Sequence, residues 1–117
     1  EIWSGKPAAV DVDSTGPWRP FRSNLRRAQA SGPNFAGRFT LVQWNCGLRC
    51  TQVVLLDTST GKPVGDLLAS TGIRFRLDSE LLIANPPESI PAGDKRTKTR
   101  YYRFTAGAFE EISVSAP

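Results

Sequence analysis

Hydrophobic residues recur along the first part of this chain with the period of an α-helix. An apolar stripe at positions i, i+4 and i+7 is formed by Phe21, Leu25 and Ala28. The other side of that helix would carry Arg22, Arg26 and Gln29. Pro20 suits a first helical position, and the run 31–33 (Ser-Gly-Pro) is a stop signal. We therefore expect one short N-terminal helix, with its helical pattern over residues 20–30 of the segment 18–32. Before it we expect an extended arm over residues 1–17, or an edge strand over residues 8–12.

From residue 37 onward the apolar period changes to two, which is the period of a β-strand. The run 53–56 (Val-Val-Leu-Leu) is apolar without a break, which predicts a strand that is covered on both faces. In the run 73–77, apolar residues alternate with Arg74 and Arg76, as in a half-exposed strand. A final hairpin is expected over residues 100–114.

These patterns predict a mainly β protein. We expect a twisted antiparallel sheet, a sandwich or a half-barrel, with about six strands and the helix packed on it. A chain of 117 residues fits one domain, 1–117, in which residues 37–114 form an antiparallel β meander. The large side chains expected in the core are Phe39, Trp44, Leu55, Phe75 and Phe104.

The two cysteines, Cys46 and Cys50, enclose three residues and so differ from the C-x-x-C motif of thiol oxidoreductases. A disulfide between them is the favoured interpretation, and two free thiols are the alternative. An extended chain would hold the two Cα atoms roughly 13 Å apart, whereas a disulfide requires them within about 7 Å. If the bond forms, the chain must reverse, and the flanking strands become an antiparallel hairpin.

Two loops are candidates for binding a partner. The hairpin tip offers Asn45, Gly47, Leu48 and Arg49, with Leu48 as an apolar plug and Arg49 as a charged anchor. A stapled turn with no further role would explain the same residues. The loop over residues 85–99 is long enough to suggest a functional or mobile segment. Its candidate binding residues are Pro86, Pro87, Glu88 and Ser89, with Lys95 and Arg96 at the rim.

The net charge of +4 is spread unevenly, because no acidic residue lies between Ser14 and Leu56. Arginines in that stretch are Arg19, Arg22, Arg26, Arg27, Arg38 and Arg49. A second basic run consists of Lys95, Arg96, Lys98, Arg100 and Arg103. The cations form either a solvated face or a surface that steers an acidic partner. Because no nucleic-acid-binding motif is present, we expect no nucleic acid partner.

No chemistry-bearing motif emerges from the sequence. The chain has no histidine, which excludes Ser-His-Asp and Cys-His catalysis and removes the commonest metal ligand. The adjacent carboxylates Glu110 and Glu111 would point to opposite faces of a strand. We therefore expect no enzyme, no catalytic residue, no metal and no cofactor. An enzyme that uses carboxylates alone is the alternative, and it would need a cleft that holds two carboxylates with shifted pKa values.

The chain contains no methionine and opens at Glu1. We expect that a signal peptide has been removed and that the protein is periplasmic, which the cysteine pair also favours. Removal of a disordered cytoplasmic N-terminus is the alternative. The longest apolar run, 53–56, is too short to span a membrane.

The run 32–37 (Gly-Pro-Asn-Phe-Ala-Gly), followed by Trp44 and the C-G-x-x-C run 46–50, resembles a motif of small exported bacterial proteins that are rich in β structure and carry a disulfide. In that family an aliphatic strand and an Asp-x-x-x-Gly-Lys-like turn follow, as they do here over residues 53–62. The resemblance extends over residues 32–85, and the stretch 78–82 also fits it.

Small size, expected export, a disulfide and the lack of catalytic residues further resemble the immunity proteins paired with type VI secretion amidases. That resemblance implies a periplasmic inhibitor that plugs the active site of a peptidoglycan amidase. The alternative is a non-catalytic module that binds a glycan or an anionic surface of the cell envelope. It would need an exposed aromatic platform, made for example by Trp3, Trp18 or Tyr101. An open sheet edge would also be compatible with a homodimer.

Overall fold

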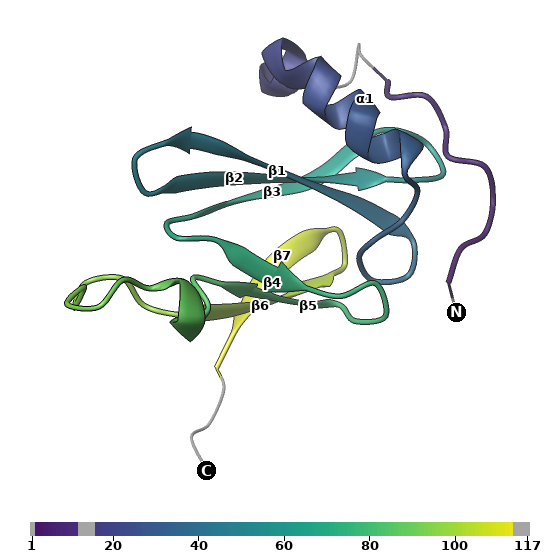
Figure 1. Ribbon diagram of the computed structural model, residues 1–117. Coiled ribbons are helices and arrows are strands. Elements are labelled where there is room, and N and C mark those ends of the chain that lie inside the picture. Colours follow the sequence, from purple (N-terminus) through teal and green to yellow (C-terminus); the bar gives the residue numbers. More distant parts are fainter. Residues whose placement is uncertain (1, 12–15, 114–117) are drawn as a thin grey trace.

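The computed structural model describes residues 2–11 and 16–113, and within them one helical segment precedes seven strands (Figure 1). The helical segment consists of a 3-10 stretch η2 (Gly16–Phe21) and the α-helix α1 (Arg22–Ala30). The strands are β1 (Phe39–Gly47), β2 (Cys50–Asp57), β3 (Pro63–Ala69), β4 (Ile73–Phe75), β5 (Leu81–Ala84), β6 (Arg100–Thr105) and β7 (Ala108–Ile112). A short 3-10 turn, η3 (Pro87–Ser89), lies between β5 and β6.

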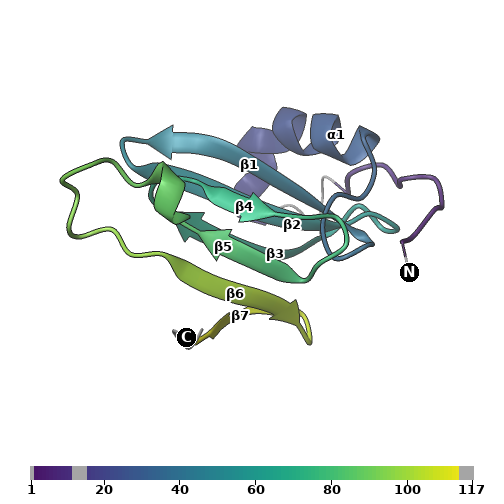
Figure 2. The same ribbon diagram turned by 60° about the horizontal axis from the view of Figure 1, so that its bottom comes forward.

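The strands form two antiparallel sheets, in the orders β1-β2-β3 and β4-β5-β6-β7. The two sheets face each other, and α1 lies on the outer side of the first (Figures 1 and 2). The predicted mainly β fold with an N-terminal helix is therefore confirmed. The strand that the sequence pattern did not single out is β3, because Pro63, Gly65 and Asp66 are poor strand formers.

The central strand β2 is buried on both faces, as its unbroken apolar run predicts. Val53 and Leu55 belong to the cluster between the two sheets, whereas Val54 and Leu56 belong to a second cluster on the other face, which includes Leu25 of α1. All four β2 side chains have no solvent exposure. Because neighbouring strand residues point to opposite faces, one strand supplies both cores.

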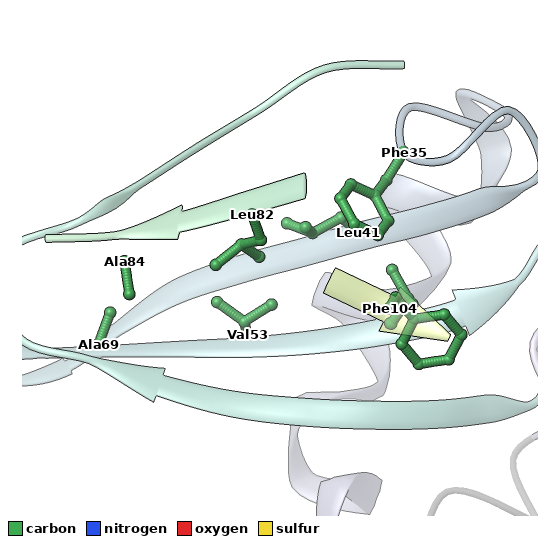
Figure 3. Packing of buried hydrophobic residues seen from close by; sticks show 8 residues of the cluster. Phe35, Leu41, Val53, Ala69, Leu82, Ala84 and Phe104 are labelled. Atoms are coloured by element: carbon green, nitrogen blue, oxygen red, sulfur yellow. The ribbon is translucent and has the colours of Figure 1, made fainter. Parts of the chain in front are cut away.

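The cluster between the sheets draws on both of them (Figure 3). Phe104 of β6 contacts the ring of Phe39 at a centroid distance of 5.0 Å and that of Phe109 at 5.1 Å. Of the predicted core residues, Leu55 is fully buried and Phe104 is nearly so, with 5% of it exposed. The others, Phe39, Trp44 and Phe75, are partly buried and pack against the two clusters. The aromatic contacts thus hold the second sheet against the first.

The predicted helix is corrected at its start and on one face. The segment starts at Gly16 as a 3-10 helix, and its α-helical part ends at Ala30, directly before the predicted stop signal 31–33. Gln29, expected on the polar side, is 3% exposed, and its Nε2 donates to the carbonyl oxygens of Ala8 and Thr58. The reason is its position, because Gln29 follows the buried Leu25 by four residues and therefore shares its face.

The N-terminal arm lies against the turn between β2 and β3. The amide of Ala8 donates to Thr58 O at 3.0 Å, and that of Asp11 donates to Gly61 O at 3.0 Å. A Cβ at Gly61 would stand 2.0 Å from Ala9 O, so only glycine fits beneath the arm. The described part of the arm, 2–11, forms no strand, and residues 12–15 lie outside the described residues. No helix in the described residues is long and apolar enough to cross a membrane.

Candidate functional site

The tip between β1 and β2 is closed by a disulfide and presents an exposed leucine. Cys46 and Cys50 are bonded, with their Cα atoms 5.0 Å apart, so the predicted hairpin is confirmed. The amide of Gly47 donates to Asn45 Oδ1 at 2.9 Å, and Gly47 adopts a φ of 133°. Leu48 is 97% exposed. The tip therefore holds an apolar side chain in water on a covalently closed turn.

The outer part of the long loop is organised around one carboxylate, Asp94. Its Oδ1 accepts the backbone N–H groups of Arg96 (2.9 Å) and Thr97 (3.0 Å), and its Oδ2 accepts the Thr97 hydroxyl at 2.6 Å. The Thr97 hydroxyl first, then the N–H of Thr97, the Arg49 guanidinium and the N–H of Arg96, hold the pKa of the Asp94 carboxyl well below its usual range. The side chain of Asp94 is only 6% exposed.

An ion pair between Arg49 and Asp94 joins the two loops. The same Arg49 nitrogen lies 3.3 Å from the hydroxyl oxygen of Thr97, and Arg49 itself adopts a φ of 53°. Both loops lie at the same end of the sandwich (Figures 1 and 2). We call residues 45–49 together with residues 93–97 the tip ridge.

The surface of the tip ridge is cationic. Its charged residues are Arg49, Asp94, Lys95 and Arg96, three cations and one anion, which gives a net formal charge of +2. The Asp94 carboxylate is surrounded by hydrogen-bond donors and shielded from solvent, whereas Lys95 and Arg96 are exposed. An open hollow of about 520 Å³ lies here, lined by Arg49 and residues 93–97. The ridge thus combines an exposed Leu48 with a positive rim.

The structure brings some predicted binding residues together and separates others. Lys95 and Arg96 lie in the ridge with the hairpin tip, whereas the run 86–89 belongs to the base of the loop. Glu88 pairs with Arg74 at 2.8 Å. Ser89 Oγ lies 2.8 Å from Thr71 Oγ1 and donates to the carbonyl oxygen of Pro86.

The two predicted prolines differ in exposure, since Pro86 is buried and Pro87 is exposed. In the described parts of the chain, the side-chain bonds of 86–89 stay within the run or reach the β3–β4 connection and β4, and none reaches the ridge.

The base of the long loop is fixed by Asn85, which sequence reasoning missed. Its Oδ1 accepts the backbone N–H groups of Ser70 (2.7 Å) and Thr71 (2.9 Å), and its Nδ2 donates to Lys98 O at 3.1 Å. Asn85 has a φ of 55°, which asparagine tolerates better than most residues. The signal in the sequence is the Asn-Pro pair at 85–86, which is typical of turn initiation.

No common aromatic platform is formed by the three residues proposed for it. Trp3 lies in the arm, where its backbone N–H donates to Gly37 O, and Trp18 packs edge-on against Trp44 at 6.1 Å. Tyr101 lies on β6, in the second sheet. All three side chains are half-buried. A ligand that needs several of these rings at once would therefore find them in separate places.

The acidic residues of the described chain are dispersed. Within residues 2–11 and 16–113, no three His, Cys, Asp or Glu side chains gather as a metal site would require. Glu111 pairs with Arg100 at 3.0 Å, and Glu110 lies opposite Arg103 in the register of β6 and β7.

Comparison of the chain with protein-family models, with curated proteins and with solved structures found no significant match. The chain is a small β-rich domain with a Cys46–Cys50 disulfide. Its function is therefore inferred from the geometry of the tip ridge.

Proposed function

We propose that this protein is an inhibitor that binds a cell-wall-degrading amidase and occludes its active site, in the manner of the immunity proteins paired with type VI secretion amidases. The observation that carries the proposal is the tip ridge. Leu48 is 97% exposed on a turn that is closed by a disulfide and braced from the long loop through Arg49 and Asp94. Export to the periplasm and the motif resemblance over residues 32–85 belong to the same proposal.

Occlusion of a cleft favours a rigid, protruding element. A flexible loop loses conformational entropy when it is ordered by binding, and a preformed loop avoids most of that loss. The Cys46–Cys50 bond and the ion pair to Asp94 restrict the turn before any partner arrives. Leu48 then supplies apolar surface, whose burial contributes about 2 kcal/mol for a leucine side chain.

The structure changes the role that we assign to Arg49. The sequence favoured it as an anchor for the partner, but its guanidinium is engaged within the chain by Asp94. We therefore assign Arg49 to bracing the ridge, and we assign the contact with the partner to Leu48. Lys95 and Arg96 face solvent and would attract an acidic cleft, which affects the association rate more than the affinity.

The test starts with an amidase recovered from periplasmic extract of the source organism on the tagged protein. Hydrolysis of purified peptidoglycan by that amidase is then measured as the protein is added. We expect activity to fall to zero at a stoichiometric amount. Leu48→Asp should raise the Kd about thirtyfold, the equivalent of about 2 kcal/mol.

Leu68→Asp is the matched control, because Leu68 is also exposed (63%) but lies on β3, outside the ridge. It should inhibit like the wild type. The proposal fails if the protein leaves the amidase active, or if Leu48→Asp combined with Lys95→Glu and Arg96→Glu inhibits as well as the unaltered chain.

A further inference from the structure

The outer face of the helical segment carries arginines and no acid. Residues 16–30 contain four arginines and no Asp or Glu. All four, Arg19, Arg22, Arg26 and Arg27, are exposed. Lys6 of the N-terminal arm lines a hollow of about 530 Å³ together with Arg26. We call Lys6 and these four arginines the basic face.

Three arginines of the basic face form no ion pair with another described residue. Arg22 donates to the carbonyl oxygen of Arg19 at 3.4 Å, which leaves its charge unpaired. In residues 2–11 and 16–113, no ion pair engages Arg22, Arg26 or Arg27. Elsewhere, by contrast, Arg49, Arg74, Arg76 and Arg100 each pair with a carboxylate. Arg22, Arg26 and Arg27 therefore offer their charge to a partner outside the chain.

Aromatic side chains stand at the η2 end of the basic face. The ring of Phe21 stacks on that of Trp44 at 4.6 Å and 23°, yet Phe21 remains 36% exposed. Trp18 meets the same Trp44 ring edge-on. Arg22 follows Phe21 directly in the sequence. A partly exposed aromatic group thus lies beside an arginine that forms no ion pair with another described residue.

From this combination we infer that the basic face is a peripheral binding site for a bilayer containing anionic phospholipid. Lys and Arg near an anionic membrane surface are attracted to it, and aromatic side chains settle at the level of the headgroups. Arginine stems can lie along apolar surface while their guanidinium groups stay in the headgroup region. A helix on the outside of the molecule also suits a planar surface, whereas a protein cleft would take a protrusion such as the tip ridge.

The binding is shallow and electrostatic. The apolar side of α1 is already used inside the protein, where Leu25 is fully buried, so that side cannot enter the bilayer. The groups that can contact the bilayer are the cations of the basic face and Phe21. The inference is independent of the inhibitor proposal, since the cations of the basic face belong to the arm and the helical segment, whereas Leu48, Lys95 and Arg96 belong to the tip ridge. The outer side of the first sheet, on which α1 lies, is seen in Figure 1.

The test is co-sedimentation of the full chain with vesicles of equimolar phosphatidylglycerol and phosphatidylcholine, compared with vesicles of phosphatidylcholine alone. We expect partition to be at least tenfold stronger with phosphatidylglycerol and to weaken as salt is added. Arg22→Gln combined with Arg26→Gln should weaken it about 25-fold, since each cation at an anionic surface contributes about fivefold. Melting curves of each variant establish that it is folded.

The matched control is Lys98→Gln combined with Arg103→Gln, which removes the same charge from exposed positions outside the basic face. Its partition should stay within about twofold of the wild type, because charge beyond a Debye length of about 10 Å is screened. An equal loss in the control would overturn the inference, since net charge alone would then explain binding. Equal partition into both kinds of vesicle would overturn it as well.

Phe21→Ser separates a bilayer from an acidic protein as the occupant. It should weaken vesicle binding several-fold. Lipids brominated in their acyl chains should quench the tryptophan fluorescence of the wild type more strongly than that of Phe21→Ser. If Phe21→Ser binds vesicles unchanged and soluble polyglutamate displaces the wild-type protein at equal charge concentration, the basic face is a site for acidic protein and the bilayer assignment is wrong.

Discussion

Arg49 and Asp94 are 45 residues apart in the sequence, and their ion pair joins the disulfide-closed hairpin to the long loop between β5 and β6. The pair is asymmetric, because the Arg49 side chain is half exposed while that of Asp94 is 6% exposed. Asp94 also caps its own loop through Arg96 and Thr97. One carboxylate therefore shapes the long loop and attaches it to the hairpin.

Removing that carboxylate should loosen the loop without unfolding the protein. In Asp94→Ala, the N–H groups of Arg96 and Thr97 lose their acceptor, so their amide hydrogen exchange should accelerate at least tenfold. The free energy of unfolding should change by about 1 kcal/mol or less, because the arginine partner is half exposed. Glu88→Gln, which removes the exposed pair with Arg74, is the control and should leave exchange at Arg96 and Thr97 unchanged. Unaltered exchange in Asp94→Ala would contradict this account.

The same carboxylate makes the loop sensitive to acid. The pKa of Asp94 is lower in the folded protein than in the unfolded chain, so its contribution to stability is fully present above the unfolded value of about 4. The contribution is lost as the pH falls from there through the folded pKa. Wild type and Asp94→Ala should therefore differ in unfolding free energy by a constant amount from neutral pH down to about 4, and converge below it. Urea titrations across this range measure the difference. If the difference in unfolding free energy between the two proteins increased as the pH fell, the prediction would be contradicted.

The disulfide should contribute modestly to stability. A closed loop this short constrains the unfolded chain by about 2 kcal/mol, so Cys46→Ser combined with Cys50→Ser should lower the unfolding free energy by about that amount. The hairpin itself should persist, because β1 and β2 stay paired from Phe39↔Asp57 to Asn45↔Thr51. Chemical denaturation gives the loss, and amide exchange along β2 reports the pairing. Complete unfolding of the double variant at room temperature would show that this estimate is too small.

Asn85→Ala should lower the free energy of unfolding more than loss of the disulfide does. It removes the acceptor of two N–H groups and the donor to Lys98 O, and it places alanine at a φ of 55°. Each buried group left without a partner costs about 1–3 kcal/mol, so we expect a loss of about 3 kcal/mol in unfolding free energy. Asn24→Ala, at a half-buried position in α1, should change stability by about 0.5 kcal/mol or less. Equal losses for the two variants would contradict the role of Asn85.

Local patterns in the sequence predicted local structure well. The spacing of Cys46 and Cys50 predicted the hairpin, because a disulfide forces a chain that short to reverse. The unbroken apolar run 53–56 predicted burial on both faces of β2, because its residues alternate between the two cores. In each case the evidence lies within a few residues, where backbone geometry fixes the outcome.

Contacts between distant segments could not be predicted from local patterns. The sequence places Gln29 on an exposed polar face of the helix. In the structure it donates to the carbonyl oxygens of Ala8 and Thr58, because the arm and the β2–β3 turn pack against the helix. The strand β3 reads as a turn exit because of its proline and glycine, and pairing with β2 overrides that propensity.

The candidate site divides in the same way. The disulfide-closed turn, its exposed Leu48 and the basic residues of both loops follow from local sequence. The packing of the two sheets is what brings Lys95 and Arg96 into the ridge, keeps the run 86–89 out of it and pairs Arg49 with Asp94. Periodicity specifies which face of an element is buried, but side-chain pairing across 45 residues depends on how two sheets and their loops pack, which no local pattern encodes.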